Sequence, residues 1–101
     1  MNVLIIAGID GAWGVDNIAM LDKTANKEGY LTACENMMKD VNAAVEGFFD
    51  GGAEKVYVLD EENHFVDGML DKRATLLNND DWEKVVKEKK VDVFAEVCTH
   101  A

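Results

Sequence analysis

The pattern of apolar and polar residues predicts strands that alternate with helices. A short apolar run at residues 2–7 is rich in β-branched side chains and precedes a glycine, as expected for a strand buried on both faces. Residues 28 to about 50 then have apolar side chains at three- and four-residue spacing, which is typical of one face of a helix. Gly51 and Gly52 are expected to end this helix, and residues 55–59 form a second buried run.

The second half of the chain continues the alternation with shorter elements. Residues 74–77 fit a short strand. Asp80 followed by Glu83 is the pattern of a capping box and predicts a helix that runs to about residue 90. The lysines of this helix lie in its later turns, near the negative end of the helix dipole. Residues 91–97 alternate as a final strand. The whole pattern predicts an α/β fold, a two-layer or three-layer sandwich around a mostly parallel sheet with a strand-helix-strand unit at its N-terminus.

Composition narrows the class of protein. A chain of 101 residues has room for one core, so we expect a single domain over residues 1–101. A formal net charge of -10 repels phosphate groups, so nucleic acid is not an expected partner. The sequence has no apolar run long enough to span a membrane and no signal-peptide pattern, so we expect a cytoplasmic protein. Cys34 and Cys98 show no framework spacing, so we expect free buried thiols.

Candidate ligands for a metal ion follow the predicted strands. Asp10 comes after the first strand, residues 60–62 are all acidic after the second, His64 lies slightly further on, and His100 follows the last. Ligands of open parallel sheets bind outside the carboxyl ends of the strands. Carboxylates and an imidazole can hold a divalent cation such as zinc, although acidic loops are often only solvated. The residues by themselves leave both interpretations open.

Two other groups of residues give weaker signals. Gly8, Gly11 and Gly14 follow the first strand, but they lack the spacing of a dinucleotide-binding loop. Cys98 and His100 resemble a nucleophile and its base, yet no third group that would orient them is evident. We expect a packed cysteine there.

The order of several motifs resembles that of the DppA-type zinc D-aminopeptidases. These motifs are residues 40–47, residues 51–60, residues 70–74 and residues 99–101. The resemblance covers the chain almost from end to end and matches the N-terminal part of those metallopeptidases. It implies an α/β fold, zinc-dependent hydrolysis of small peptides or amino-acid-like compounds, and a ring-forming homo-oligomer.

The resemblance also implies a set of metal ligands. The family's first strand ends in Asp-x-Glu-Gly, and here Gly8 takes the place of the Asp and Asp10 that of the Glu. In the family's Asn-Asp-x-His after the second strand, Glu62 stands where the His is expected, and His64 would serve only if the loop is two residues longer. The closing Gly-x-His-Ala keeps its histidine as His100.

The departures from the family motifs change the expected site. Loss of the bridging Asp at Gly8 removes a charge and a ligand, so we predict one zinc ion held by Asp10, Glu62 and His100 rather than two ions. The family's remaining carboxylate ligand and its catalytic His lie further along its sequence, so activity would require residues of a partner chain. The alternatives are a non-catalytic binding or assembly module with a decayed metal site, and a part of a longer enzyme.

Overall fold

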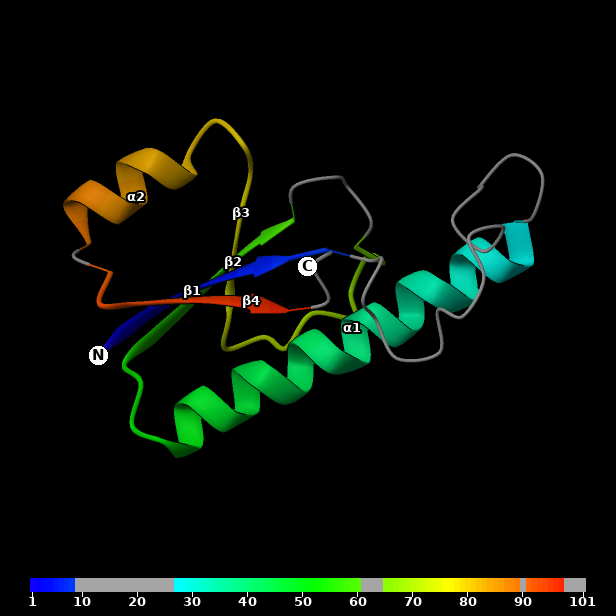
Figure 1. Cartoon of the computed structure of the whole chain (residues 1–101), viewed down its shortest axis with the longest axis horizontal. Helices are drawn as coiled ribbons and strands as arrows, with labels where there is room; N and C mark the ends of the chain where they lie inside the picture. The colour runs from blue at the N-terminus through cyan, green and yellow to red at the C-terminus, as the bar shows by residue number, and fades with distance from the viewer. Residues whose placement is uncertain (9–26, 61–64, 90, 98–101) are drawn as a thin grey trace.

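A single parallel sheet organises the part of the protein that the computed structural model describes (Figure 1). The described residues are 1–8, 27–60, 65–89 and 91–97. The four strands of the sheet are β1 (Asn2–Ala7), β2 (Lys55–Asp60), β3 (Thr75–Leu77) and β4 (Val93–Val97). All neighbouring strands pair in parallel, and their order in the sheet is β3-β2-β1-β4. The predicted α/β class is therefore confirmed.

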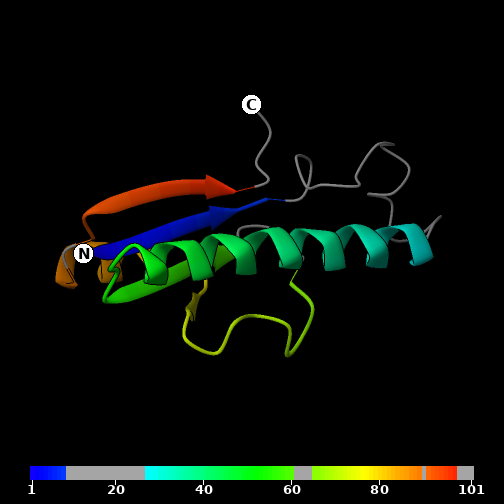
Figure 2. The same cartoon turned by 90° about the horizontal axis from the view of Figure 1, so that it is seen from below.

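Helix α1 (Lys27–Asp50) covers one face of the sheet. Its 24 residues span about 36 Å, whereas a six-residue strand spans about 20 Å. The first turns of α1 therefore extend past the carboxyl ends of the strands (Figure 2). The side chain of Leu31, which the spacing predicts on the buried face, is 50% exposed, so the prediction is wrong at that position. Tyr30 and Cys34, on the adjacent turns, pack in the core.

The core beneath α1 is continuous. Its buried side chains come from β1, β2 and one stripe of the helix, and those of the helix are Ala33, Cys34, Met37, Met38, Val41 and Val45. The segment between β2 and β3 packs against the same core through Phe65, Val66, Met69, Leu70 and Ala74. At the end of α1, Gly52 adopts φ +101°, a left-handed conformation that glycine reaches without strain, as the sequence predicts.

Helix α2 (Trp82–Glu88) covers the opposite face, which makes three layers. Val85 and Val86 pack on this second core, as expected. The predicted cap at Asp80 is wrong, because the N-cap residue of α2 is Asp81, which makes no side-chain cap hydrogen bond. The acceptor in the turn before the helix is Oδ1 of Asn78. It accepts the N–H groups of Asp80 and of Asp81, each at 2.9 Å. The strand ends just before Asn78, so its side chain folds back over the turn that begins the helix.

Asn2 joins three elements at the amino edge of the sheet. Its N–H donates to Oδ2 of Asp92 at 2.8 Å, and its side-chain amide donates to the carbonyl of Lys89 at 2.7 Å. The N–H of Asp92 returns a bond to the carbonyl of Asn2 at 2.8 Å. These bonds attach the end of α2 and the approach to β4 to the first strand. Among the described helices, none is long and apolar enough to cross a membrane.

Candidate functional site

The carboxyl ends of the four strands meet at one edge of the sheet. Ala7 at the end of β1 is opposite Asp60 of β2 and opposite Val97 of β4. Leu59 is opposite Leu77, the last residue of β3. The N–H of Gly8 donates to the carbonyl of Val97 at 3.0 Å, which extends the pairing of β1 and β4 by one residue. The chain therefore leaves all four strands along a single row (Figure 1).

The predicted metal ligands Asp10, Glu62 and His100 lie outside the described residues, as does the alternative ligand His64. The structure places the strand ends from which these residues follow, and it brings those ends together. Within the described part of the chain, no three His, Cys, Asp or Glu side chains are grouped closely enough to hold a metal ion. The predicted ligand set therefore remains a prediction.

Asp60 has a structural contact at this edge that its sequence context does not reveal. Its Oδ2 accepts the N–H of Phe65 at 2.9 Å, and both residues are partly buried. Residues 61–64 therefore lie in the sequence between two residues that are hydrogen-bonded to each other. In the sequence, Asp60 is only the first of three consecutive acids that follow a predicted strand. An acid at a strand end is compatible with such a bond, but nothing in the sequence identifies Phe65, five residues later, as its partner.

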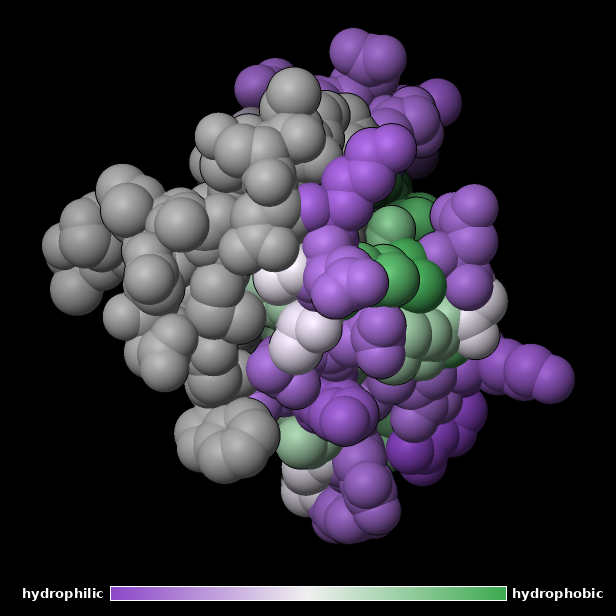
Figure 3. Space-filling model, turned by 90° about the vertical axis from the view of Figure 1, so that its right-hand side faces the viewer, coloured by the Kyte–Doolittle hydropathy of each residue, from purple (hydrophilic) through white to green (hydrophobic). Residues whose placement is uncertain are grey.

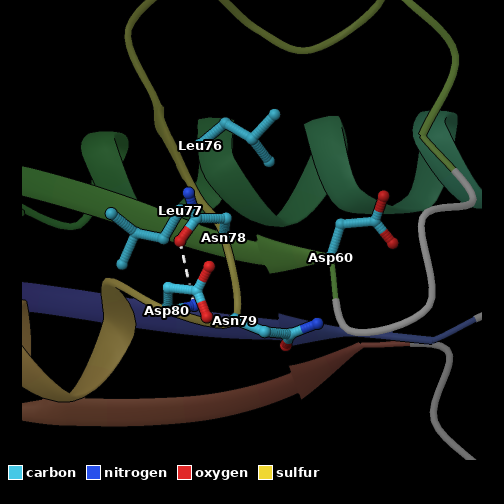
Figure 4. Close-up of a pocket in the computed structure, with 6 residues that line it drawn as sticks. All are labelled: Asp60, Leu76, Leu77, Asn78, Asn79 and Asp80. Carbon is cyan, nitrogen blue, oxygen red and sulfur yellow. Dashed lines mark hydrogen bonds between the residues drawn. The ribbon is translucent and has the colours of Figure 1, made fainter.

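A cavity of about 400 Å³ opens beside Asp60 at the β2–β3 side of this edge (Figure 4). Its other lining residues are Leu76, Leu77, Asn78, Asn79 and Asp80. These side chains include two carboxylates and no cation, so the cavity has a negative potential. Figure 3 views the molecule from the side towards which the strands point, and polar side chains predominate over the part of this face that is coloured.

Cys34 lies under this edge on α1. Its side chain is 3% exposed, and the residue is free of any disulfide, as the sequence predicts. Burial raises the pKa of the thiol, the charges of Asp60 and Glu35 raise it further, and a hydrogen bond with Tyr30 partly opposes the shift. A buried, protonated thiol is a poor nucleophile, so Cys34 is a core residue. Cys98, the other predicted free thiol, lies outside the described residues.

One of the sequence motifs, residues 40–47, attaches α1 to the segment that follows β2. The side-chain amide of Asn42 donates to the carbonyl of Met69 at 2.7 Å, and its Oδ1 accepts the N–H of Asp71 at 2.8 Å. Both contacts are partly buried. Asn42 therefore satisfies one backbone acceptor and one backbone donor of the segment. This motif has a structural role.

A second motif, residues 70–74, is organised by an ion pair. Arg73 donates to both carboxylate oxygens of Asp71, at 3.1 Å through Nε and at 2.8 Å through a terminal nitrogen. The guanidinium carbon also lies 4.9 Å from the centroid of the Phe49 ring on α1. The hydrogen bonds from Arg73 lower the pKa of Asp71 to about 2. The ion pair lies within the segment, and the contact of Arg73 with Phe49 joins the segment to α1.

The fold and the edge together define a class of protein. An open, all-parallel α/β sheet whose strand ends meet beside carboxylates is the architecture in which ligands bind outside those ends. Residues 1–95 match the model of the peptidase family M55, described as D-aminopeptidase. The chain belongs to this family, and the resemblance noted in its sequence is confirmed. Comparisons with curated proteins and with solved structures found no match.

Proposed function

We propose that the protein is a metal-dependent aminopeptidase of the D-aminopeptidase type, with one zinc ion held by Asp10, Glu62 and His100. The register of the strands supports this proposal, because one row contains Ala7, Asp60 and Val97. Each proposed ligand follows this row by two or three residues. A chain advances at most about 3.6 Å per residue and neighbouring strands lie about 4.8 Å apart, so the three side chains are within reach of a common ion.

The proposed donors fit a zinc ion chemically. Two carboxylates balance the charge of a divalent cation, and the His100 imidazole adds the nitrogen donor that zinc favours. His64 is the alternative to Glu62 as the ligand that follows β2. Three protein ligands leave an open coordination position, as in catalytic rather than purely structural sites. A zinc ion bound there would supply Lewis-acid chemistry towards a peptide carbonyl.

Peptide hydrolysis also requires a general base and donors that stabilise the oxyanion. The proposal assigns these roles to a second copy of the chain in a homo-oligomer. Its substrates are small cytoplasmic peptides or amides with an N-terminal D-amino acid. Membership of the family supports this substrate class.

The proposal is tested first by the metal content of the whole chain, purified without chelator. We expect close to one zinc ion per chain in the wild-type protein and its loss in Asp10→Ala and in His100→Ala. Asp80→Ala is the matched control, because it removes a carboxylate from the neighbouring cavity and should retain the metal. A wild-type protein without metal would contradict the proposal and favour the assembly module.

The identity of the ligand after β2 requires a second pair of variants. Loss of zinc in Glu62→Ala with retention in His64→Ala would assign Glu62, and the reverse would assign His64. The zinc-loaded protein should then hydrolyse D-amino-acid amides, with a specific activity that falls on dilution as the oligomer dissociates. An activity independent of concentration across the dissociation range would overturn the requirement for a partner chain.

A further inference from the structure

We propose that Asp67 is a site of spontaneous backbone modification, at which the link to Gly68 isomerises to an isoaspartyl link through a cyclic imide. The proposal is independent of the metal site. It starts from an aspartate followed by glycine, a pair that occurs at Asp10, Asp50 and Asp67. Glycine has no Cβ, so its backbone nitrogen can approach the preceding carboxyl group closely. The first pair lies outside the described residues, and the structure places the other two in very different surroundings.

Asp67 and Gly68 are the two central residues of an exposed turn. The N–H of Met69 donates across this turn to the carbonyl of Val66 at 3.2 Å. Gly68 adopts φ +80°, which is typical of the third residue of a type II turn. Both central residues are exposed to solvent. In the part of the chain that the structure describes, the N–H of Gly68 has no acceptor, so its nitrogen is available to the neighbouring carboxyl group.

The Asp50–Gly51 pair is protected by helix α1. Asp50 is the last residue of this helix, and the N–H of Gly51 donates to the carbonyl of Gly47 at 3.0 Å. The bond directs the nitrogen towards the preceding turn of the helix. It must open before the nitrogen can attack the Asp50 carboxyl group, so the reaction there requires local unfolding of the helix end.

The isomerisation needs no reagent other than water. The nitrogen of Gly68 attacks Cγ of the protonated Asp67 carboxyl group in an intramolecular step. A C–N bond forms, and the hydroxyl of the carboxyl group leaves as water with the amide proton. Water then adds to one of the two imide carbonyls and breaks its C–N bond. Cleavage at Cγ restores the original link, whereas cleavage at the α-carbonyl leaves the chain running through Cγ.

The modified link should disturb the segment that covers the core under α1. An isoaspartyl link adds a methylene carbon to the backbone between two residues of the turn. Val66 and Met69, on either side, pack against the core, and the carbonyl of Met69 accepts the side-chain amide of Asn42 at 2.7 Å. A longer backbone between these fixed positions is expected to break the Val66–Met69 hydrogen bond and to lower the stability of the protein.

The two pairs can be compared within one sample, because trypsin separates them into the peptides of residues 40–55 and 56–72. The full chain is aged in its folded state and, in parallel, unfolded in urea. Isoaspartate in each peptide is measured with an isoaspartyl methyltransferase and located by fragmentation in a mass spectrometer. In the folded protein we expect accumulation at Asp67 to be at least about tenfold faster than at Asp50, which corresponds to about 1.4 kcal/mol for opening the helix end.

Urea provides the first control. Both pairs lack structure in the unfolded chain, so their rates should become similar. Asp67→Glu is the matched variant, because it keeps the charge but would have to close a larger ring, which forms far more slowly. It should accumulate no isoaspartate at this position and keep its urea midpoint on ageing, whereas the midpoint of the aged wild type should fall. Asp50→Glu should leave the rate at Asp67 unchanged.

Three results would overturn the inference. Equal rates at Asp67 and Asp50 in the folded protein, or a slower rate at Asp67, would show that the turn protects its pair as well as the helix does. A difference that persists in urea would show that the flanking residues, and not the fold, set the two rates. An unchanged urea midpoint in wild-type protein that has isomerised at Asp67 would refute the effect on the covering segment.

Discussion

The two faces of the sheet are covered to very different extents. Among the residues that the structure describes, the core between the sheet and α1 contains eleven buried residues, whereas the core on the α2 face contains four. On the α2 face, Phe94 of β4 is 55% exposed although it pairs with the fully buried Leu4 of β1. The comparison shows that residues paired across one sheet can differ completely in burial.

The lengths of the covering elements explain the difference. The 24 residues of α1 span the sheet, and the segment after β2 packs beside the helix on the same core. The seven residues of α2 span only about 10 Å, and their apolar side chains pack with Leu4, Tyr57, Leu59 and Leu77. Phe94 lies on the edge strand, outside that group. A short helix leaves the edge of its face exposed.

The largest expected effect comes from truncating one side chain on each face. Met38→Ala should lower the free energy of unfolding by about 2–5 kcal/mol, because Met38 is fully buried and its loss leaves a cavity. Phe94→Ala should change it by no more than about 0.5 kcal/mol, as for most exposed side chains. Urea denaturation measures both. Similar losses in the two variants would mean that Phe94 is buried in solution and that the faces are not so unequal.

A smaller effect should separate Asn78, the acceptor in the turn before α2, from Asp80, the cap that the sequence predicts. Asn78→Ala should cost about 0.5–2 kcal/mol, because two N–H groups lose their common acceptor. Asp80→Ala should cost much less, since only the backbone of Asp80 takes part in these bonds. Circular dichroism during urea denaturation compares them. A larger loss in Asp80→Ala would restore the capping box and contradict the observed turn.

The smallest effect concerns the ion pair of Asp71 and Arg73, which lies within the segment that packs on the α1 face. The pKa of Asp71 is lowered from its ordinary value of 3.8 to about 2, so the folded state favours the ionised carboxylate. The resulting stabilisation is present above the ordinary value and is lost as the pH falls through about 2. NMR titration of the Asp71 carboxyl carbon measures this shift.

Arg73→Gln provides the control for this titration. Because the hydrogen bonds from Arg73 are the main cause of the lowered pKa, the substitution should return the pKa of Asp71 towards its ordinary value. A pKa near 2 in Arg73→Gln would attribute the shift to another group and weaken the role of the ion pair.

The candidate site could be predicted from the sequence only in part. Residue type and position after a strand indicate Asp10, His100 and the acidic run of residues 60–62, because those features are local. The choice of Glu62 within that run comes from the resemblance to the family motifs. The hydrogen bond between Asp60 and Phe65 could not be predicted, because any acid in the run of residues 60–62 is an equally good acceptor. The same holds for Asn42, whose partners lie 27 and 29 residues further along the chain.

The sequence by itself determined the strands β1, β2 and β4, the long helix α1 and the parallel α/β class. Buried apolar runs and helical spacing are local properties, and they set these elements to within about two residues of their observed bounds. Only the tertiary structure decided the register that aligns Ala7, Asp60 and Val97, and the exposure of Phe94. The physical reason is that register and burial depend on which elements pack together across the fold, which no local spacing encodes.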